Sequence, residues 1–282
     1  MSWVSSSPES ASSVSSTASF AATTRAGPAS RSSEALAGGA ILLAAFIAWE
    51  ARTSDPLLPL RLFRDRSFTV ANLVGLTFSF GIFGSIFILI QFLQIVQGHT
   101  PLEAGLMTMP WTLAPMVIAP LTGLLSPRTG TRLPIVLGLS FLAIAMGWLA
   151  VRMSATVAYI DLVPAFLLAG IGMGLVFAPS STAVLANMVP NDHAKATGTN
   201  STLREIGVAL GVAVLTAVFT GAGGELTPTG YVDAAVPAIV VGASVLALAA
   251  VIGLALPHGR RAPAATPAPA TPATPAPATL SV

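Results

Sequence analysis

The sequence predicts an all-α integral membrane protein: a bundle of six spanning helices plus one possible partial helix. Hydrophobic residues make up 54% of the chain and charged residues only 9%, whereas a soluble globular domain carries about 25% charged residues. Several apolar stretches reach about 20 residues, the length that a helix needs to cross a bilayer. These stretches do not alternate polar and apolar residues, so they do not predict the strands of a membrane β-barrel.

The chain before the bundle divides into three segments. Residues 1–34 are rich in Ser, Ala and Thr and lack an early apolar core, so we expect a disordered leader rather than a signal peptide. Residues 35–51 are apolar but short for a span, and we expect a tilted or truncated membrane helix. Residues 52–66 are rich in arginine, and Pro56 and Pro59 oppose a regular helix at the start. We expect this segment to be a solvated cytoplasmic linker.

Residues 67–256 contain the six expected spans. Prolines inside the second span are expected to bend it, and a polar elbow over residues 189–196 separates the fourth span from the fifth. Residues 257–282 repeat Pro, Ala and Thr, a composition that favours extended, disordered chain. The expected spans are Ser67–Val96, Ala104–Leu125, Leu133–Val151, Leu162–Ala186, Thr199–Phe219 and Val236–Leu256, and the prolines of the second are Pro110, Pro115 and Pro120.

Basic residues lie almost entirely in the connections on one side of the expected bundle. The opposite connections hold Arg152 as their only base, so the positive-inside rule places the linker and the C-terminus in the cytoplasm. Because the bases are spread between apolar stretches, the net charge of +2 and the pI near 9.7 do not indicate a nucleic-acid partner. The bases on the cytoplasmic side are Arg52, Arg61, Arg64, Arg66, Arg128, Arg132, Lys195, Arg260 and Arg261.

No catalytic or metal-binding pattern is present in the sequence. The three histidines are isolated in connections, cysteine is absent, and there is no phosphate loop, nucleophile elbow or His-x-x-x-His pair. We therefore expect no enzyme, no cofactor and no metal site.

The first expected span carries two glutamines on one face. Phe80, Gly84, Phe87, Gln91 and Gln94 follow the spacing of a helical stripe. Amide side chains in an apolar helix should face protein or water rather than lipid. Two interpretations stay open: a ligand-facing wall of a substrate path, or ordinary hydrogen bonding between helices.

The fifth expected span contains the only acidic residue within a span, Glu205. Asn200 and Arg204 share a face with Gly207 and Gly211, and Glu205 lies beside that face. A carboxylate within a membrane span is costly and often functional, so proton coupling is one interpretation. An ion pair with Arg204 or a loop arginine is the favoured one, because Glu205 lies only about two turns beyond the polar elbow and charges near a helix end can reach the interface.

Two Gly-x-x-x-Gly patterns, Gly170 to Gly174 and Gly207 to Gly211, predict close approach of helices. They lie in the sequences LLAGIGMGLVFAP (167–179) and GTNSTLREIGVALGVAV (198–214). These sequences, together with AGLMTMPWTLAPMVIAPLTGLL (104–125), resemble the C-terminal half of a major facilitator superfamily transporter. The resemblance is to the drug:proton antiporter branch with fourteen spans, and it covers about residues 36–256.

The sequence GLLSPRTGTR (123–132) is similar to the second, weaker copy of the family's cytoplasmic loop motif. Gly123, Arg128, Gly130 and Arg132 match that motif. Pro127 occupies the position of the motif's aspartate, so the resemblance does not carry over the gating role of that carboxylate.

The resemblance implies a substrate path between two bundles, at the middle of the membrane. It implies export of drugs or small hydrophobic solutes across the plasma membrane by alternating access, driven by a proton gradient, with Phe87, Gln91, Gln94 and Asn200 as candidates for the path. The N-terminal bundle of the family is not in this sequence, so a further part, another chain or a homodimer would complete the path. The alternative is a truncated, non-transporting fragment or an assembly partner of a full transporter.

Overall fold

The computed structural model describes most of the chain between residues 60 and 257. The described residues are Ala45, Ala48, Trp49, Arg52, Thr53, 60–225 and 227–257. The leader, most of the expected partial helix and the tail from residue 258 lie outside this set. Residues 1–59 and 60–282 form two separate units, and only the second is built from long helices that the structure describes.

Between residues 60 and 257 the described chain forms helices and no strands, which confirms the all-α class. Five of these helices are long and apolar enough to cross a membrane, and the bent pair α4–α5 makes a sixth if it crosses as one broken span. The helices are α3 (Arg66–Gln91), α4 (Pro101–Met107), α5 (Met109–Thr129), α6 (Arg132–Arg152), α7 (Tyr159–Leu185), α8 (His193–Gly221) and α9 (Pro228–Gly253), with the short helices η1 (Leu60–Arg64), η2 (Phe92–Val96) and η3 (Pro190–Asp192).

Several helices begin earlier than the sequence predicts, and α8 and α9 differ most. Helix α8 begins at His193 rather than Thr199, and α9 begins at Pro228 rather than Val236. Polar residues at these positions suggested loops, but the first turns of a spanning helix can project beyond the apolar layer and remain polar. Proline suits the first turn of α9, because the missing N–H has no partner there in any helix.

The predicted bend in the second span occurs at Thr108, where α4 and α5 meet at 42°. Pro110 lies just beyond the break and cannot donate a backbone hydrogen bond into α4. Helix α5 continues through Pro115 and Pro120 without a further break. The expectation of a bent helix is therefore confirmed, with the bend placed before the first proline.

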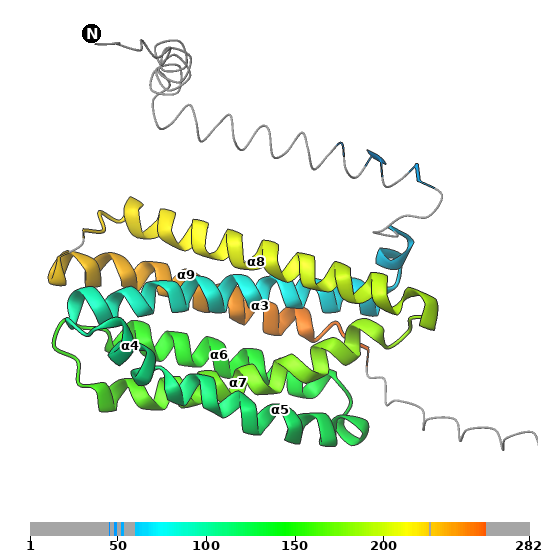
Figure 1. The fold of residues 1–282 in the computed structure, drawn as a ribbon, viewed down its shortest axis with the longest axis horizontal. Helices are drawn as coiled ribbons and strands as arrows, with labels where there is room; N and C mark the ends of the chain where they lie inside the picture. The colour runs from blue at the N-terminus through cyan, green and yellow to red at the C-terminus, as the bar shows by residue number, and fades with distance from the viewer. Residues whose placement is uncertain (1–44, 46–47, 50–51, 54–59, 226, 258–282) are drawn as a thin grey trace, which may run out of the picture. The chain divides into compact units, whose positions relative to one another are not determined.

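The helices pack as two groups of three. Helix α3 packs mainly against α8 and α9, α7 packs mainly against α5 and α6, and contacts between α6 and α9 join the groups. Figure 1 shows α3, α8 and α9 side by side on one side of the bundle, with α5, α6 and α7 on the other. This pattern of major contacts stays the same when α3 is exchanged with α7, α5 with α8 and α6 with α9. Two structural repeats of three spans each would produce such a pattern.

Both predicted glycine patterns mark close helix contacts. A Cβ atom on Gly170 would lie 2.7 Å from the carbonyl oxygen of Trp111, and one on Gly174 would lie 2.7 Å from Cβ of Ile118, so α7 approaches α5 closely. A Cβ on Gly207 or Gly211 would lie still closer to the carbonyl oxygens of Leu76 and Phe80, so α8 also approaches the backbone of α3 closely. The packing interpretation of these glycines is confirmed.

The end of the basic linker is folded, unlike the solvated loop that the sequence predicts. Residues Leu60–Arg64 form the 3-10 helix η1, and Leu62 is only 6% exposed. Arg61 donates to the carboxylate of Asp192, and Asp65 caps α3 by accepting from the N–H of Phe68. The expected linker is therefore anchored to the bundle over its last residues.

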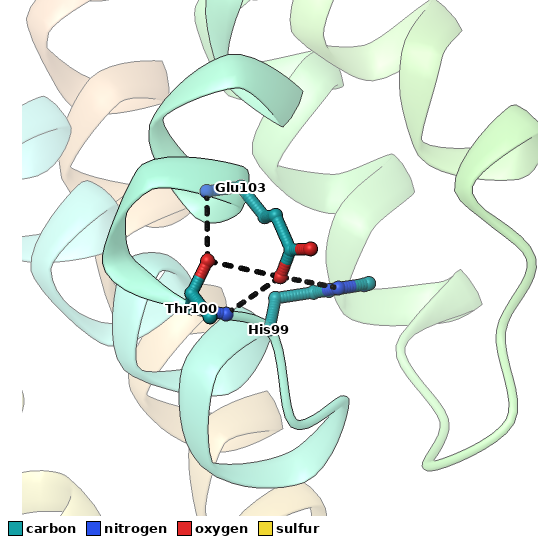
Figure 2. A network of polar contacts seen from close by, with 3 residues as sticks. All are labelled: His99, Thr100 and Glu103. Atoms are coloured by element: carbon teal, nitrogen blue, oxygen red, sulfur yellow. Dashed lines mark hydrogen bonds and ion pairs between the residues drawn. The ribbon is translucent and has the colours of Figure 1, made fainter.

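The exposed turn between α3 and α4 carries a reciprocal cap. The Thr100 hydroxyl accepts from the N–H of Glu103, and the Glu103 carboxylate accepts from the N–H and the hydroxyl of Thr100 (Figure 2). His99 lies 3.8 Å from the same carboxylate. This capping box fixes where α4 begins.

Candidate functional site

A polar pocket lies among α3, α7 and α8, surrounded by apolar and aromatic side chains. Its volume is about 10 Å³, close to the minimum that accommodates one water molecule. Helix α3 contributes Gly75 and Phe78. The other lining residues are Val176, Phe177 and Ser180 of α7 and Asn200 and Arg204 of α8.

An amide pair closes the side of this pocket where α3 meets α8. The Nδ2 group of Asn200 donates to Oδ1 of Asn72 at 3.1 Å, and Nδ2 of Asn72 donates to the carbonyl oxygen of Phe68 at 2.9 Å. Both asparagines are buried, with 8% and 1% of their surface exposed. The absence of a Cβ at Gly75 permits this approach, because a Cβ there would lie 3.3 Å from Nδ2 of Asn200.

Arg204 stacks on an aromatic pair across the pocket. Its Cζ atom lies 4.5 Å from the ring centroid of Phe177, and that ring meets Phe78 edge to face at 5.6 Å. Within residues 60–257, as far as they are described, Arg204 donates no hydrogen bond and forms no ion pair. The aromatic ring attracts the positive charge of Arg204 and does not accept hydrogen bonds from it. The five N–H donors of the guanidinium are therefore not used by this contact.

Ser180 supplies a second unused polar group. The residue is 8% exposed, and its Oγ atom has no hydrogen-bond partner among the described residues. It follows Pro179, which interrupts the hydrogen bonding of α7 because proline has no N–H. Arg204, Ser180 and Asn200 thus place polar side chains around the same small space.

Glu205 lies on the other face of α8. It is twelve residues beyond the start of the helix, or about 18 Å along its axis, rather than near a helix end. The residue is exposed, and no ion pair within 4 Å joins it to a base in the part of the chain that the structure describes. Arg204 and Glu205 are therefore neighbours in sequence whose side chains face different surroundings.

The other path candidates lie farther along α3. Phe87 is 40% exposed, whereas Gln91 and Gln94 are half-buried. Gln91 is sixteen residues beyond Gly75, about 24 Å along a helix. Because α3 and α8 run in the same direction, with Gly75 beside Arg204 and Gly84 beside Gly211, the structure does not bring the glutamines to Asn200.

The loop motif forms the turn between α5 and α6. Gly130 has φ of +72°, a left-handed conformation that favours glycine, and Arg132 begins α6. Arg128 lies in the last turn of α5, and Gly123 lies within that helix with no atom near the position of an added Cβ. Of the four matched residues, Gly130 has the clearest conformational role.

Asn72, Phe177 and Ser180 are site residues that sequence reasoning missed. Asn72 is a lone amide in an apolar stretch, and Ser180 follows an intrahelical proline, so each carried a weak signal. Their convergence with Asn200 and Arg204 depends on tertiary packing. In the described residues, no group of three or more His, Asp or Glu side chains is placed to hold a metal ion.

The chain matches the family model described as Major Facilitator Superfamily over residues 15–212 and 73–281. It is 34% identical over 181 residues to "Multidrug resistance protein Stp" of Mycobacterium tuberculosis, covering 64% of this chain and 33% of that protein. It is 30% identical over 185 residues to "Multidrug resistance protein B homolog" of the same species, covering 64% and 34%.

A third relative is the "Tetracenomycin C resistance and export protein" of Streptomyces glaucescens, which is 26% identical over 205 residues, covering 72% of this chain and 38% of that protein. The matched part of the chain thus spans about a third of the length of these curated relatives.

Proposed function

This chain belongs to the Major Facilitator Superfamily, a family of transporters rather than enzymes, and we propose that it forms one six-helix bundle of a drug exporter. The printed names of three relatives describe multidrug resistance or antibiotic export, which supports drugs or small hydrophobic solutes as the cargo. The polar pocket around Arg204 is the observation that carries the proposal, because a half-buried cation with free donors in a membrane span indicates function.

The second wall of the substrate path comes from outside the described residues. We infer that α8 faces that wall, because Glu205 is exposed in the middle of the helix beside Ile206 and Leu210, which are also exposed. A carboxylate at this position should face protein or water rather than lipid. The wall would be an N-terminal bundle of a longer protein with fourteen spans, another chain or a second copy.

We further propose that the exporter works by alternating access in the plasma membrane, with the basic ends of α3 and α8 in the cytoplasm. The distribution of bases supports this orientation, and it places the end of α9 on the same side. Glu205 is the proposed coupling carboxylate, since its position would allow access to a water-filled path. A proton gradient would then drive export.

Transport by reconstituted protein tests this proposal. Vesicles containing the purified chain would be loaded with ethidium, a hydrophobic cation, and efflux would be followed by fluorescence after a pH gradient is imposed. We expect faster efflux of ethidium than from protein-free vesicles loaded in the same way. Efflux should also be faster with the pH gradient than without it. Cross-linking in the same vesicles would report whether the active species contains one copy or two.

Folded, inserted protein without efflux would contradict transport by this chain alone or as a homodimer. It would favour the alternative function, a membrane partner that assembles with a full transporter. Capture of a second membrane protein with the chain from its native membrane would then be expected. Efflux that ignores the pH gradient would contradict proton coupling alone.

A further inference from the structure

Arg204 lacks an anionic partner on every helix that surrounds it. The residues lining its pocket are apolar, aromatic or neutral polar, and none is acidic. Glu205 attracts the guanidinium electrostatically but forms no ion pair with it. Charged groups within membrane proteins usually pair with one another or with backbone carbonyls, so the described part of the bundle leaves this cation incompletely compensated.

The pocket has the chemistry of a small acceptor site. Ser180 is nine-tenths buried, its Oγ atom has no partner in the described chain, and it lines the same space as Arg204. A volume of about 10 Å³ admits one oxygen atom but not a large group. Water would fill the space and accept from both donors, but it would leave the charge of Arg204 uncompensated.

We propose that this pocket binds one oxygen of a carboxylate, which accepts hydrogen bonds from the Arg204 guanidinium and the Ser180 hydroxyl. Phe177 and Phe78 hold the guanidinium in place, since Arg204 stacks on the first ring and the second ring supports it. Charge-assisted hydrogen bonds of this kind are about twice as strong as neutral ones. The carboxylate comes either from an acidic side chain of the second bundle that completes the path or from a transported solute.

Formate is the probe, because it is the smallest carboxylate. The full chain, labelled with ¹⁵N-arginine and purified in detergent, would be titrated with sodium formate at constant ionic strength, and the Nε–H resonances followed by NMR. The Arg204 resonance is identified by its absence from Arg204→Lys. We expect it to move and saturate at millimolar formate, and Ser180→Ala to weaken the apparent affinity about fivefold, the effect of losing one hydrogen bond.

Arg152 provides a matched control within the same sample. Its Cζ atom lies 5.4 Å from the ring centroid of Trp148, so it also stacks on an aromatic ring, but it is exposed and outside the pocket. Its resonance should not saturate with formate. An Arg204 resonance that stays still, moves only as Arg152 does, or responds equally to chloride would overturn the carboxylate site.

A second measurement identifies the source of the carboxylate. This measurement rests on the proposed export function, whereas the formate titration does not. In vesicles that contain the Arg204→Gln variant, efflux of a fluorescent carboxylic acid would be compared with efflux of its neutral methyl ester. Loss of acid export with ester export retained assigns the site to the solute, and loss of both assigns it to a side chain that positions the bundles. Unchanged export of both would overturn a role in transport while leaving the formate result intact.

Discussion

Arg61 and Asp192 join two segments that lie 131 residues apart in the sequence. A single nitrogen of Arg61 donates to both carboxylate oxygens of Asp192, at 2.8 and 3.1 Å. Asp192 immediately precedes α8, so this contact ties the segment before α3 to the turn between α7 and α8. Asn187 reinforces the connection by donating to Oδ2 of Asp65 at 3.1 Å. The two parallel helices α3 and α8 are thus linked at the ends where both begin.

Arg61→Ala should lower the stability of the bundle. The carboxylate of Asp192 is largely buried while the Arg61 side chain is 68% exposed, so we expect a loss of about 1 kcal/mol rather than the larger cost of breaking a fully buried pair. Thermal unfolding of the purified protein in detergent measures the change. Arg64→Ala is the matched control, because Arg64 is an exposed arginine of the same short helix. Equal effects of the two substitutions would exclude a specific role for the ion pair.

Gly211→Ala should be among the most damaging small substitutions. An added Cβ would collide with the carbonyl group of Phe80, which belongs to the backbone of α3 and cannot rotate away. We expect a loss of about 3 kcal/mol, the upper part of the range for overpacking. Gly198→Ala on the same helix meets no atom within 4 Å and should be neutral, or stabilising by up to about 1 kcal/mol. Similar unfolding temperatures for the two variants would contradict the close contact.

The contrast between these glycines shows what sequence patterns predicted and what they did not. Composition and apolar length were sufficient for the all-α class and the approximate helices, because a spanning helix must satisfy its own backbone in lipid. The Gly-x-x-x-Gly spacing further predicted close packing, which is a local property of one helix face. The starts of α8 and α9 were wrong by several residues, since polar first turns have the same composition as loops.

The candidate site was only partly predictable for a different reason. Asn200 and Arg204 stood out as polar residues of one helix face, but their partners Asn72 and Ser180 come from other helices. Residues 72 and 200 are 128 positions apart, and no period in one sequence reports that contact. Phe87, Gln91 and Gln94 were grouped with Asn200 as side chains that could face a substrate path, but distance along α3 separates the two glutamines from Asn200.

Gly130→Ala should strain the turn between α5 and α6. The φ angle of +72° places this residue in the left-handed region, where an ordinary side chain costs about 1 to 2 kcal/mol. We expect a loss of that size in the free energy of unfolding, measured in mixed micelles. Gly123→Ala tests another glycine of the same loop motif, at an open position of α5, and should be neutral or slightly stabilising. A neutral Gly130→Ala would show that the turn can be remodelled without cost.

Asn72 and Asn200 should be energetically coupled. Interhelical hydrogen bonds in membrane proteins contribute about 0.6 kcal/mol on average and up to about 1.7 kcal/mol, and burial of both residues favours the upper part of that range. A double-mutant cycle of Asn72→Ala and Asn200→Ala, read by unfolding in detergent, measures the coupling. Thr202→Ala replaces Asn200→Ala in the control cycle, because its exposed hydroxyl donates only within α8, to Gly198. Additive losses in the first cycle would contradict the hydrogen bond.

Glu205→Gln should separate transport from its driving force. If the carboxylate carries the coupled proton, the amide variant still moves substrate down a gradient but does not respond to a pH gradient. We therefore expect exchange of labelled substrate between vesicles and buffer to remain within about twofold of the unmodified chain, while gradient-driven efflux falls at least tenfold. Glu103→Gln is the matched control, because Glu103 is an exposed carboxylate in the cap of α4 and glutamine also suits that capping position. Retention of full gradient-driven efflux by Glu205→Gln would remove this residue from the coupling mechanism, whereas parallel loss of exchange and efflux would assign it to the architecture of the path.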